Sequence, residues 1–358
     1  MSNDQPHQQE AFDLIEHEPG VQEVCFPCED SSTDKREVFV SVNVTAFQHE
    51  KFIEQCLESI CTQQTDFRFE VLVGEDGSSD ETRAICLKYA EKYPQRVRLI
   101  LHDRSNLIKV HGKPTGRFNQ LTNFKLGRGK YIAFCDGDDY WTDPEKLQKQ
   151  ATFLNENSSF AIAYHDMQKV DATGKQLSGP VLGERFCVDR SGYQVMAWKS
   201  PIHPSSAMVR RSHINNLPAA FREVMCADLF MLGFVAQYGK AGVVSVHPGA
   251  YRIHSGGIFS KESQLARARY TLATYQKLLE CLVQPRRSVV GERLCVFHNV
   301  VIWELLTARK FSEAAVQTVQ LIRDVPGKIG WWFPFYQMKW IARMFLSLIH
   351  ISEPTRPY

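Results

Sequence analysis

The sequence lacks the features that define several large protein classes. Its 358 residues contain no apolar run long enough to span a membrane, which takes about 18 residues. The opening residues MSNDQPHQQE lack the basic and apolar regions of a secretory signal. Neither sign of charge is in excess, because 42 Lys and Arg residues stand against 40 Asp and Glu residues. We therefore expect a cytoplasmic protein whose partner is not nucleic acid.

Cysteine is present but not in a metal-binding or disulfide framework. The ten cysteines are scattered singly apart from Cys25-Phe-Pro-Cys28, and a lone CxxC is a weak signal for zinc or redox chemistry. Cys56, Cys86 and Cys135 lie in apolar patterns, where thiols pack as small hydrophobic side chains. We interpret the cysteines as reduced thiols and leave the role of Cys25 and Cys28 open.

Strand and helix patterns alternate along the chain. With 44% hydrophobic and 23% charged residues, the composition is that of an ordinary folded protein. Alternation of this length favours the α/β class, with a mostly parallel sheet covered on both faces and ligand sites at the carboxyl ends of the strands. The β-rich runs cover residues 38–44, 69–73, 97–101, 131–135 and 160–165.

These patterns divide the chain into four parts. Residues 1–36 are polar and acidic, with little periodicity, and are predicted to be a flexible or loosely docked leader. Residues 37–260 are predicted to form the catalytic domain, and residues 261–345 a helical C-terminal region. Residues 346–358 resemble the translation of a sequencing-library adapter, so they are kept out of the fold.

Three carboxylates within four residues are the strongest chemical signal. Asp136, Asp138 and Asp139 follow an apolar strand and precede Tyr140 and Trp141. Like charges this close raise one another's pKa unless a cation binds between them, and carboxylate oxygens suit Mg²⁺ or Mn²⁺. Such a metal also neutralises a diphosphate leaving group. A solvated acidic turn is the alternative, but the strand before the cluster and the aromatic residues after it argue against it.

A second acidic cluster follows another predicted strand. Glu75 and Asp76 precede Gly77, where the chain turns into a predicted helix. Their carboxylates could accept hydrogen bonds from a nucleobase N–H and from ribose hydroxyls. The alternative is an ordinary turn in which Ser78 and Glu81 form a capping box. Two such clusters at neighbouring strand ends favour a ligand site.

Together these residues resemble glycosyltransferase family 2. The similarity rests on residues 38–48, Glu75-Asp-Gly-Ser78 and Asp136-Gly-Asp-Asp139, and covers roughly residues 37–257. It implies an inverting transferase with the GT-A fold, a Rossmann-like sheet flanked by helices, here with a helical C-terminal extension. It also implies a nucleotide-sugar donor, for which we favour a UDP-sugar, and a divalent metal, Mn²⁺ or Mg²⁺.

The resemblance also implies roles for individual residues on the nucleotide side. Thr45, Ala46 and Phe47 would flank the base, Glu75 would bind it, and Asp76 would lie beside it. The chain has Thr45-Ala-Phe-Gln48 where the family usually has Pro, a small residue, Tyr and Asn. Glu75 replaces the usual Asp, which leaves the identity of the nucleotide open.

In the same family Asp138 would be the main metal ligand. Asp136 and Gly137 would contact the nucleotide, and Asp139 the diphosphate or donor sugar. Asp228, in Met225-Cys-Ala-Asp-Leu-Phe-Met231, would be the base that removes the proton from the acceptor hydroxyl as it attacks the anomeric carbon. The alternative for Asp228 is an N-cap on the helix that it precedes.

Downstream segments add further candidates. In Tyr251-Arg-Ile-His254, His254 is a candidate metal ligand, and Arg252 offers a planar fork to the diphosphate or donor sugar. The alternative for His254 is a packed or surface histidine. His203 and Ser206, with Trp141, are candidates for the acceptor pocket, although Pro-rich turn chemistry also explains the 200–206 segment.

The segment 327–345 is crowded with aromatic side chains and carries Lys328, Lys339 and Arg343. It suits either a membrane interface at the inner face, which would fit a lipid-linked acceptor, or a helix packed on the catalytic domain. The oligomeric state, the donor sugar and the acceptor glycan are not encoded in recognisable motifs.

We therefore predict an inverting transferase that acts in glycan or surface polysaccharide synthesis. Two alternatives are weighed against it. A nucleotidyltransferase usually has a Gly-rich, Lys-containing loop after its first strand, and residues 45–50 contain no such loop. A non-catalytic nucleotide-sugar or glycan-binding protein is disfavoured by the presence of both acidic clusters and Asp228.

Overall fold

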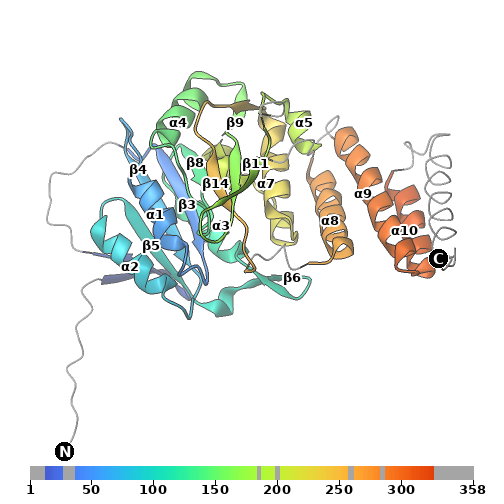
Figure 1. Cartoon of the computed structure of the whole chain (residues 1–358), viewed down its shortest axis with the longest axis horizontal. Coiled ribbons are helices and arrows are strands. Elements are labelled where there is room, and N and C mark those ends of the chain that lie inside the picture. The colour runs from blue at the N-terminus through green and yellow to red at the C-terminus, as the bar shows by residue number, and fades with distance from the viewer. Residues whose placement is uncertain are drawn as a thin grey trace, which may run out of the picture.

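A large sheet forms the centre of the computed structural model, which describes residues 13–26, 37–183, 187–197, 202–256, 262–282 and 287–325 (Figure 1). Its strands are Asp13–Glu18 (β1), Val21–Cys25 (β2), Val40–Ala46 (β3), Phe69–Glu75 (β4), Val97–His102 (β5), Tyr131–Phe134 (β8), Phe160–Tyr164 (β9), Met208–Arg210 (β12) and Lys240–Val243 (β13). They pair in the order β1-β2-β5-β4-β3-β8-β12-β9-β13.

The centre of this sheet is parallel. β5, β4, β3 and β8 run in one direction, and β9 and β13 also pair in parallel. β12 is antiparallel to both of its neighbours, and the β1–β2 hairpin is antiparallel to β5. The predicted α/β class, with a Rossmann-like sheet flanked by helices, is confirmed, and the antiparallel strands lie at one edge and at β12.

Helices cover both faces because side chains alternate along each strand. In β8, Tyr131 and Ala133 pack with one buried cluster, whereas Ile132 and Phe134 pack with the other. The first cluster includes residues of α1, α2 and α4, and the second includes residues of α3, α5 and α7. The bounds are Ile53–Cys61 (α1), Thr82–Lys92 (α2), Arg117–Leu126 (α3), Lys146–Glu156 (α4), Gly192–Met196 (α5), Arg211–Ile214 (α6) and Ala227–Val235 (α7).

Shorter elements surround the carboxyl ends of the parallel strands. β14 pairs in parallel with β10, and Tyr140 bridges to Ala250 of β14, which brings residues 249–254 beside the acidic loop after β8. The bounds of these elements are Ile108–Val110 (β6), Lys113–Thr115 (β7), Met167–Val170 (β10), Gln176–Pro180 (β11), Gly249–Arg252 (β14) and the 3₁₀ turns Arg104–Asn106 (η1), Pro204–Ser206 (η2), Ala219–Arg222 (η3) and Ala236–Tyr238 (η4).

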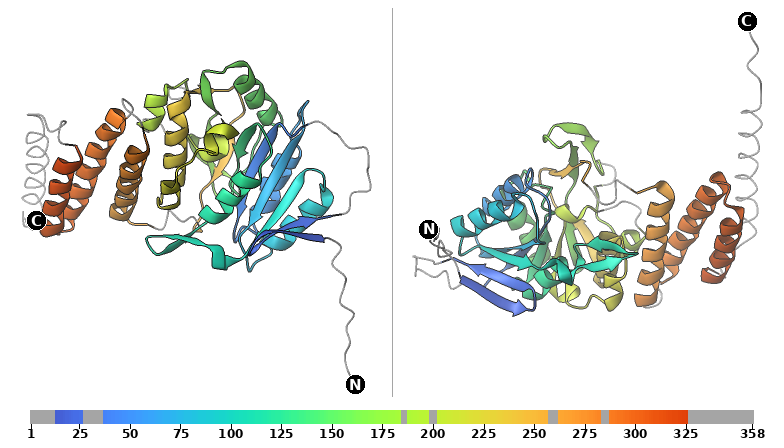
Figure 2. Two further views of the ribbon diagram at one scale, coloured as in Figure 1. Left: turned by 180° about the vertical axis from the view of Figure 1, so that it is seen from behind. Right: turned by 90° about the horizontal axis from the view of Figure 1, so that it is seen from below.

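Three helices extend from the sheet domain as a row, each packed on the one before it (Figure 2). They are Gln264–Cys281 (α8), Arg287–Thr307 (α9) and Phe311–Asp324 (α10). α8 approaches α7 closely at Gly233, where an added Cβ would lie 2.8 Å from Leu278 Cδ2.

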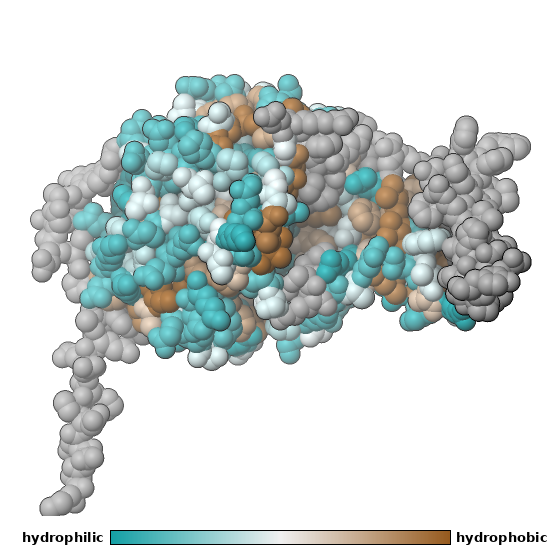
Figure 3. All heavy atoms as spheres, viewed as in Figure 1, coloured by the Kyte–Doolittle hydropathy of each residue, from teal (hydrophilic) through white to brown (hydrophobic). Residues whose placement is uncertain are grey.

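In the face shown in Figure 3 the sheet domain is largely hydrophilic, and apolar side chains are visible at the surface among these helices.

No helix in the described part of the chain is long and apolar enough to cross a membrane. The aromatic segment 327–345 and the adapter-like residues 346–358 lie outside the described residues. Cys28 lies outside them too, so the CxxC motif is described only at Cys25, which is half-buried at the end of β2.

The prediction of a flexible or loosely docked leader is wrong for residues 13–25. These residues form the β1–β2 hairpin, which extends the sheet beyond β5. Val21 and Val24 are buried, and Glu23 accepts hydrogen bonds from Arg98 Nε at 2.7 Å and Nη2 at 3.0 Å. One of the acidic residues of this segment, Glu23, is thus buried against a half-buried arginine.

We expect Arg98→Met to destabilise the fold by about 3 kcal/mol, because the buried carboxylates of Glu23 and Glu70 would both lose a cationic partner. Arg128→Met is the matched control, because Arg128 also pairs with Glu70 but is exposed, and it should cost less than about 1 kcal/mol. Urea unfolding measures both variants. Equal losses would contradict the structural importance of the Arg98 network.

Candidate active site

Backbone hydrogen bonds join the two acidic clusters at the end of β3. The amide of Gly137 donates to Thr45 O at 3.1 Å, and the amide of Asp76 donates to Ala46 O at 3.0 Å. Gly137 cannot be larger, because an added Cβ would lie 2.8 Å from Thr45 O and 2.7 Å from His49 Nδ1. The predicted clusters therefore lie on either side of one strand end.

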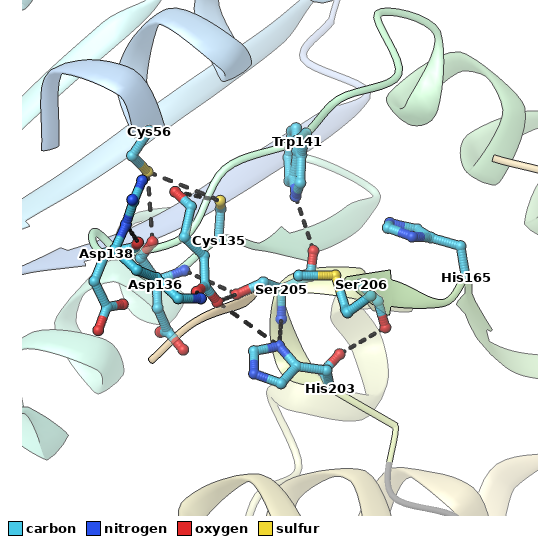
Figure 4. A network of polar contacts seen from close by, with 12 residues as sticks. Cys56, Cys135, Asp136, Asp138, Trp141, His165, His203, Ser205 and Ser206 are labelled. Atoms are coloured by element: carbon cyan, nitrogen blue, oxygen red, sulfur yellow. Dashed lines mark hydrogen bonds and ion pairs between the residues drawn. The ribbon is translucent and has the colours of Figure 1, made fainter. Parts of the chain in front are cut away.

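The carboxylates of the acidic loop after β8 differ in exposure and in their partners; Figure 4 shows Asp136 and Asp138 of this loop near Ser205 and His203. Asp138 is 24% exposed, and its Oδ2 lies 3.0 Å from His254 Nε2. Asp139 is only 2% exposed, and it accepts hydrogen bonds from Ser205 Oγ at 2.6 Å and from the amide of Arg252 at 2.9 Å. Asp138 is therefore open to a ligand, whereas Asp139 is bonded inward.

Burial dominates the electrostatics of this loop, and mutual repulsion between its carboxylates adds to the effect. Burial and the charges of Asp138 and Asp228 raise the pKa of Asp136 to about 8. Burial and its two neighbours raise the pKa of Asp139 well above its usual range. Burial also opposes ionisation of Asp138, but the hydrogen bond from His254 and the charge of His49 hold its pKa below the ordinary value. Asp138 is thus the carboxylate best suited to bind a cation.

Asp138 and His254 fit a divalent cation by ligand type, because carboxylate oxygen and imidazole nitrogen both bind Mn²⁺. His254 Nδ1 accepts a hydrogen bond from the amide of Gly256 at 3.2 Å. Ligation through Nε2 would move the imidazole proton to Nδ1 and end that contact. Within the described residues no three His, Cys, Asp or Glu side chains are grouped to hold a metal on their own. A cation here would need further ligands from a bound substrate.

On the nucleotide side, Glu75 and Asp76 differ in what they can bind. Glu75 is 0% exposed, and its two oxygens accept from the amide of Ser78 at 2.6 Å and from Arg83 Nε at 2.7 Å. Asp76 is 5% exposed, burial raises its pKa to about 6, and the guanidinium of Arg104 lies 3.9 Å from its carboxylate. This geometry leaves Asp76, not Glu75, available to a ligand.

An exposed aromatic side chain follows the end of β3 in this region. Phe47 is 38% exposed, and the guanidinium of Arg104 stacks over its ring at 4.0 Å.

The predicted capping box is wrong, because α2 begins after Glu81 with no side-chain cap, and Ser78 Oγ accepts from the amide of Gln48 at 3.0 Å.

Arg252 is not free to bind phosphate. Its Nε donates to Asp138 O at 2.8 Å, and its Nη2 donates to Gln55 Oε1 at 2.7 Å. Its Nη1 donates to carbonyls of the turn after β10, and its guanidinium lies 4.8 Å from the ring centroid of Phe52. The structure therefore corrects the predicted contact of Arg252 with the diphosphate: the guanidinium of Arg252 instead holds the acidic loop in place.

The residues predicted for the acceptor pocket also separate. Trp141 is buried and donates from Nε1 to Ser205 O at 2.8 Å, and the ammonium of Lys146 lies over its ring at 3.7 Å. Ser206 is buried, and its hydroxyl donates to His203 O. These two residues are structural, because neither has a polar atom free for a ligand. His203 retains a partly exposed ring, which packs against the ring of Tyr251 in a tilted arrangement with the centroids 4.3 Å apart.

Asp228 lies in the first turn of α7 and is exposed to solvent. Desolvation by the surrounding protein nevertheless raises its pKa, and the charge of Arg117 opposes that rise. Asp228 does not cap α7, whose N-cap is Cys226. Its charge raises the pKa of Asp136, so the structure brings the two predicted groups together.

Sequence reasoning missed several residues of the site. Ser205 and Tyr251 lie within segments already singled out, but nothing in their spacing distinguishes them from their neighbours. His49 follows the end of β3 and carries a buried Nδ1 that has no hydrogen-bond partner within the described residues. Arg117 had no sequence signal, because it is an ordinary cation at the start of a helix.

Comparisons with known proteins agree with this geometry. The model of the family described as glycosyl transferase family 2 matches residues 41–217. An uncharacterized protein of Mycobacterium tuberculosis is 30% identical over 267 residues, which are 71% of this chain and 72% of the relative. The chain belongs to glycosyltransferase family 2, and it is a glycosyltransferase.

Solved structures show the same fold. TarS 1–349 of S. aureus, in complex with UDP-GlcNAc, is 20% identical with a TM-score of 0.54, over 74% of this chain and 72% of that one. The mannosyltransferase PcManGT of Pyrobaculum calidifontis, in complex with GDP-Man and Mn²⁺, is 17% identical with a TM-score of 0.56, over 85% of this chain and 84% of that one. The GT-A prediction is therefore confirmed.

We expect Ser205→Ala to destabilise the protein by about 1–3 kcal/mol and to lower transferase activity, because Asp139 would lose a buried donor and the acidic loop would loosen. Ser206→Ala is the control. The amide of Ser206 also donates to His203 O, so that carbonyl stays paired, and activity should be retained. Thermal unfolding and sugar transfer measure the pair. Equal loss of activity in both variants would contradict the role given to Ser205.

Proposed function

We propose that the protein is an inverting glycosyltransferase that moves a sugar from a nucleotide diphosphate onto an acceptor hydroxyl in glycan or surface polysaccharide synthesis. The observation that carries the proposal is the exposed, desolvated carboxylate of Asp228 facing the acidic loop that holds Asp136 and Asp138. Asp228 could accept a proton while the acidic loop binds the leaving group.

The nucleotide is proposed to bind where β3 and β4 end. Asp76 could accept a hydrogen bond from a base N–H, and the exposed ring of Phe47 offers a stacking surface. Glu75 would act indirectly, by holding the turn at Ser78 and the helix residue Arg83. A UDP-sugar is the donor that we favour, although a guanine base presents N–H donors to a carboxylate as well.

The diphosphate is proposed to lie against the acidic loop. A divalent cation, Mn²⁺ or Mg²⁺, held there by Asp138 and His254 would neutralise the charge of the leaving diphosphate. Arg252 would keep Asp138 in place through its hydrogen bond to the carbonyl of Asp138, and Asp139 would anchor the loop through its buried carboxylate. The neighbour PcManGT was solved in complex with GDP-Man and Mn²⁺, which supports this proposal.

Asp228 is proposed to take the proton from the acceptor hydroxyl as its oxygen attacks the anomeric carbon. A base is most effective when its pKa approaches the working pH, and the raised pKa of Asp228 moves it in that direction. His203 and Tyr251 would line the acceptor side. Peripheral contact with a membrane stays a prediction, because the segment that motivates it lies outside the described residues.

Both alternatives fit the geometry less well. A nucleotidyltransferase would need phosphate-binding groups after β3, where the chain instead has Phe47, Gln48 and His49. A non-catalytic binding protein would not need the desolvated carboxylate of Asp228, because binding of the nucleotide does not involve this residue.

A thermal-shift screen tests donor binding. We expect one nucleoside diphosphate, or its sugar, to raise the unfolding temperature only when Mn²⁺ or Mg²⁺ is present, because ligand binding stabilises by mass action. Asp138→Ala should abolish the metal-dependent part of the rise in unfolding temperature. Asp76→Asn should reduce the rise in unfolding temperature that the nucleotide causes. Asp143→Ala provides a control carboxylate that is bonded to Lys149 outside the site. A panel without any shift would contradict the donor assignment.

For the proposed base, we expect Asp228→Asn to keep donor binding and to lose transfer by about 100-fold to 10,000-fold, because the amide cannot accept the hydroxyl proton. Initial rates of sugar transfer and the donor thermal shift measure the two properties separately. Full activity in this variant would exclude Asp228 as the base, and parallel loss of donor binding would give it a structural role instead.

A further inference from the structure

A buried arginine faces the proposed base from the donor side. Arg117 is the first residue of α3 and is 4% exposed. Its Nη2 donates to Val224 O at 3.1 Å, and its guanidinium lies 4.2 Å from the ring centroid of Phe221. Its Nη1 is buried and has no hydrogen-bond partner within the described residues.

Such a guanidinium is costly to keep. Burying a charge without a close counter-ion is strongly unfavourable, and no carboxylate of the described chain lies within ion-pair distance of Arg117. Burial lowers the pKa of Arg117 to about 10, and the charge of Asp228 is the largest influence in the opposite direction. Stacking on Phe221 offsets part of the cost. The remaining electrostatic partner is Asp228.

Arg117 also contacts the segment that leads into α7. Phe221 and Val224 belong to this segment, residues 221–226, and Asp228 follows it in the first turn of α7. Two residues further along α3, Asn119 Nδ2 donates to Gly74 O of β4 at 2.7 Å, directly before Glu75 and Asp76. One helix therefore touches both the nucleotide end of the sheet and the segment that carries the base.

We propose that Arg117 is a positioning residue for sugar transfer, which braces residues 221–226 and presents a buried positive charge to Asp228. The proposal rests on the role given to Asp228 above. The groups whose charges bear on Asp228 are Asp136 from the loop after β8, Tyr251 from β14, Cys226 from its own segment and Arg117 from α3.

The sign of the effect follows from this set. Arg117 is the cation among these groups, and it favours the ionised form of Asp228. If Arg117 becomes neutral, desolvation by the surrounding protein remains and opposes the ionisation of Asp228. The pKa of Asp228 then rises, and kcat/KM is lost at a higher pH because a protonated carboxyl cannot accept a proton.

The test compares Arg117→Gln, which removes the charge, with Arg117→Lys, which keeps it. Arg210→Gln is the control, because Arg210 likewise bonds carbonyls, those of Leu154, Asn157 and Phe160, but it pairs with Tyr131 at the start of β8, at the end of that strand away from the acidic loop. The full chain is labelled with ¹³C at the aspartate carboxyl carbons. The Asp228 signal is assigned as the one missing in Asp228→Asn, and pH profiles of kcat/KM are measured alongside.

We expect Arg117→Gln to raise the titration midpoint of Asp228 and the acid limb of kcat/KM by about one pH unit, which is about a ten-fold loss of kcat/KM on the acid side. Arg117→Lys should keep both near the wild-type values, and Arg210→Gln should move neither. An unmoved Asp228 midpoint in a folded Arg117→Gln protein would overturn the proposal. Full transfer by Asp228→Asn would instead overturn the base assignment, so the two failures are distinguishable.

Discussion

The buried carboxylate of Asp139 is the anchor on which the site depends. It accepts hydrogen bonds from Ser205 of η2 and from the amide of Arg252 in β14, so it joins two distant segments to the end of β8. Once these bonds form, the loop can expose Asp138 and bring it beside His254. A carboxyl group, which most proteins keep at the surface, here holds the loop from inside the protein, and both of its oxygens accept hydrogen bonds.

Arg252 completes this arrangement from the opposite side. Its guanidinium binds the carbonyl of Asp138, the side chain of Gln55 in α1 and the turn after β10. The loop is therefore held by its side chain at Asp139 and by its backbone at Asp138. This leaves one carboxylate free for a cation, and it explains why three acidic residues within four positions need not all be ligands.

Sequence patterns predicted much of the fold, because strand and helix periodicity is local. The alternation along β3, β4 and β8 is readable from apolar spacing, and the acidic residues at their ends follow from where those strands stop. The β1–β2 hairpin was missed because Glu23 reads as a solvent-exposed acid, and only the approach of Arg98 from β5 explains its burial. The parallel centre of the sheet was predictable, but the antiparallel insertion of β12 was not.

The sequence by itself determined which residues are chemically able to act: the acidic pairs after β4 and β8, the later Asp228, and His254. Only the tertiary structure decided which of them are available, because hydrogen-bond partners come from segments far apart in the chain. Arg83 and Ser78 occupy Glu75, and Ser205 and the Arg252 amide occupy Asp139, whereas Asp76 and Asp138 keep capacity for a ligand. Residue type sets what a group can bind, and its three-dimensional neighbours set whether that capacity is already used.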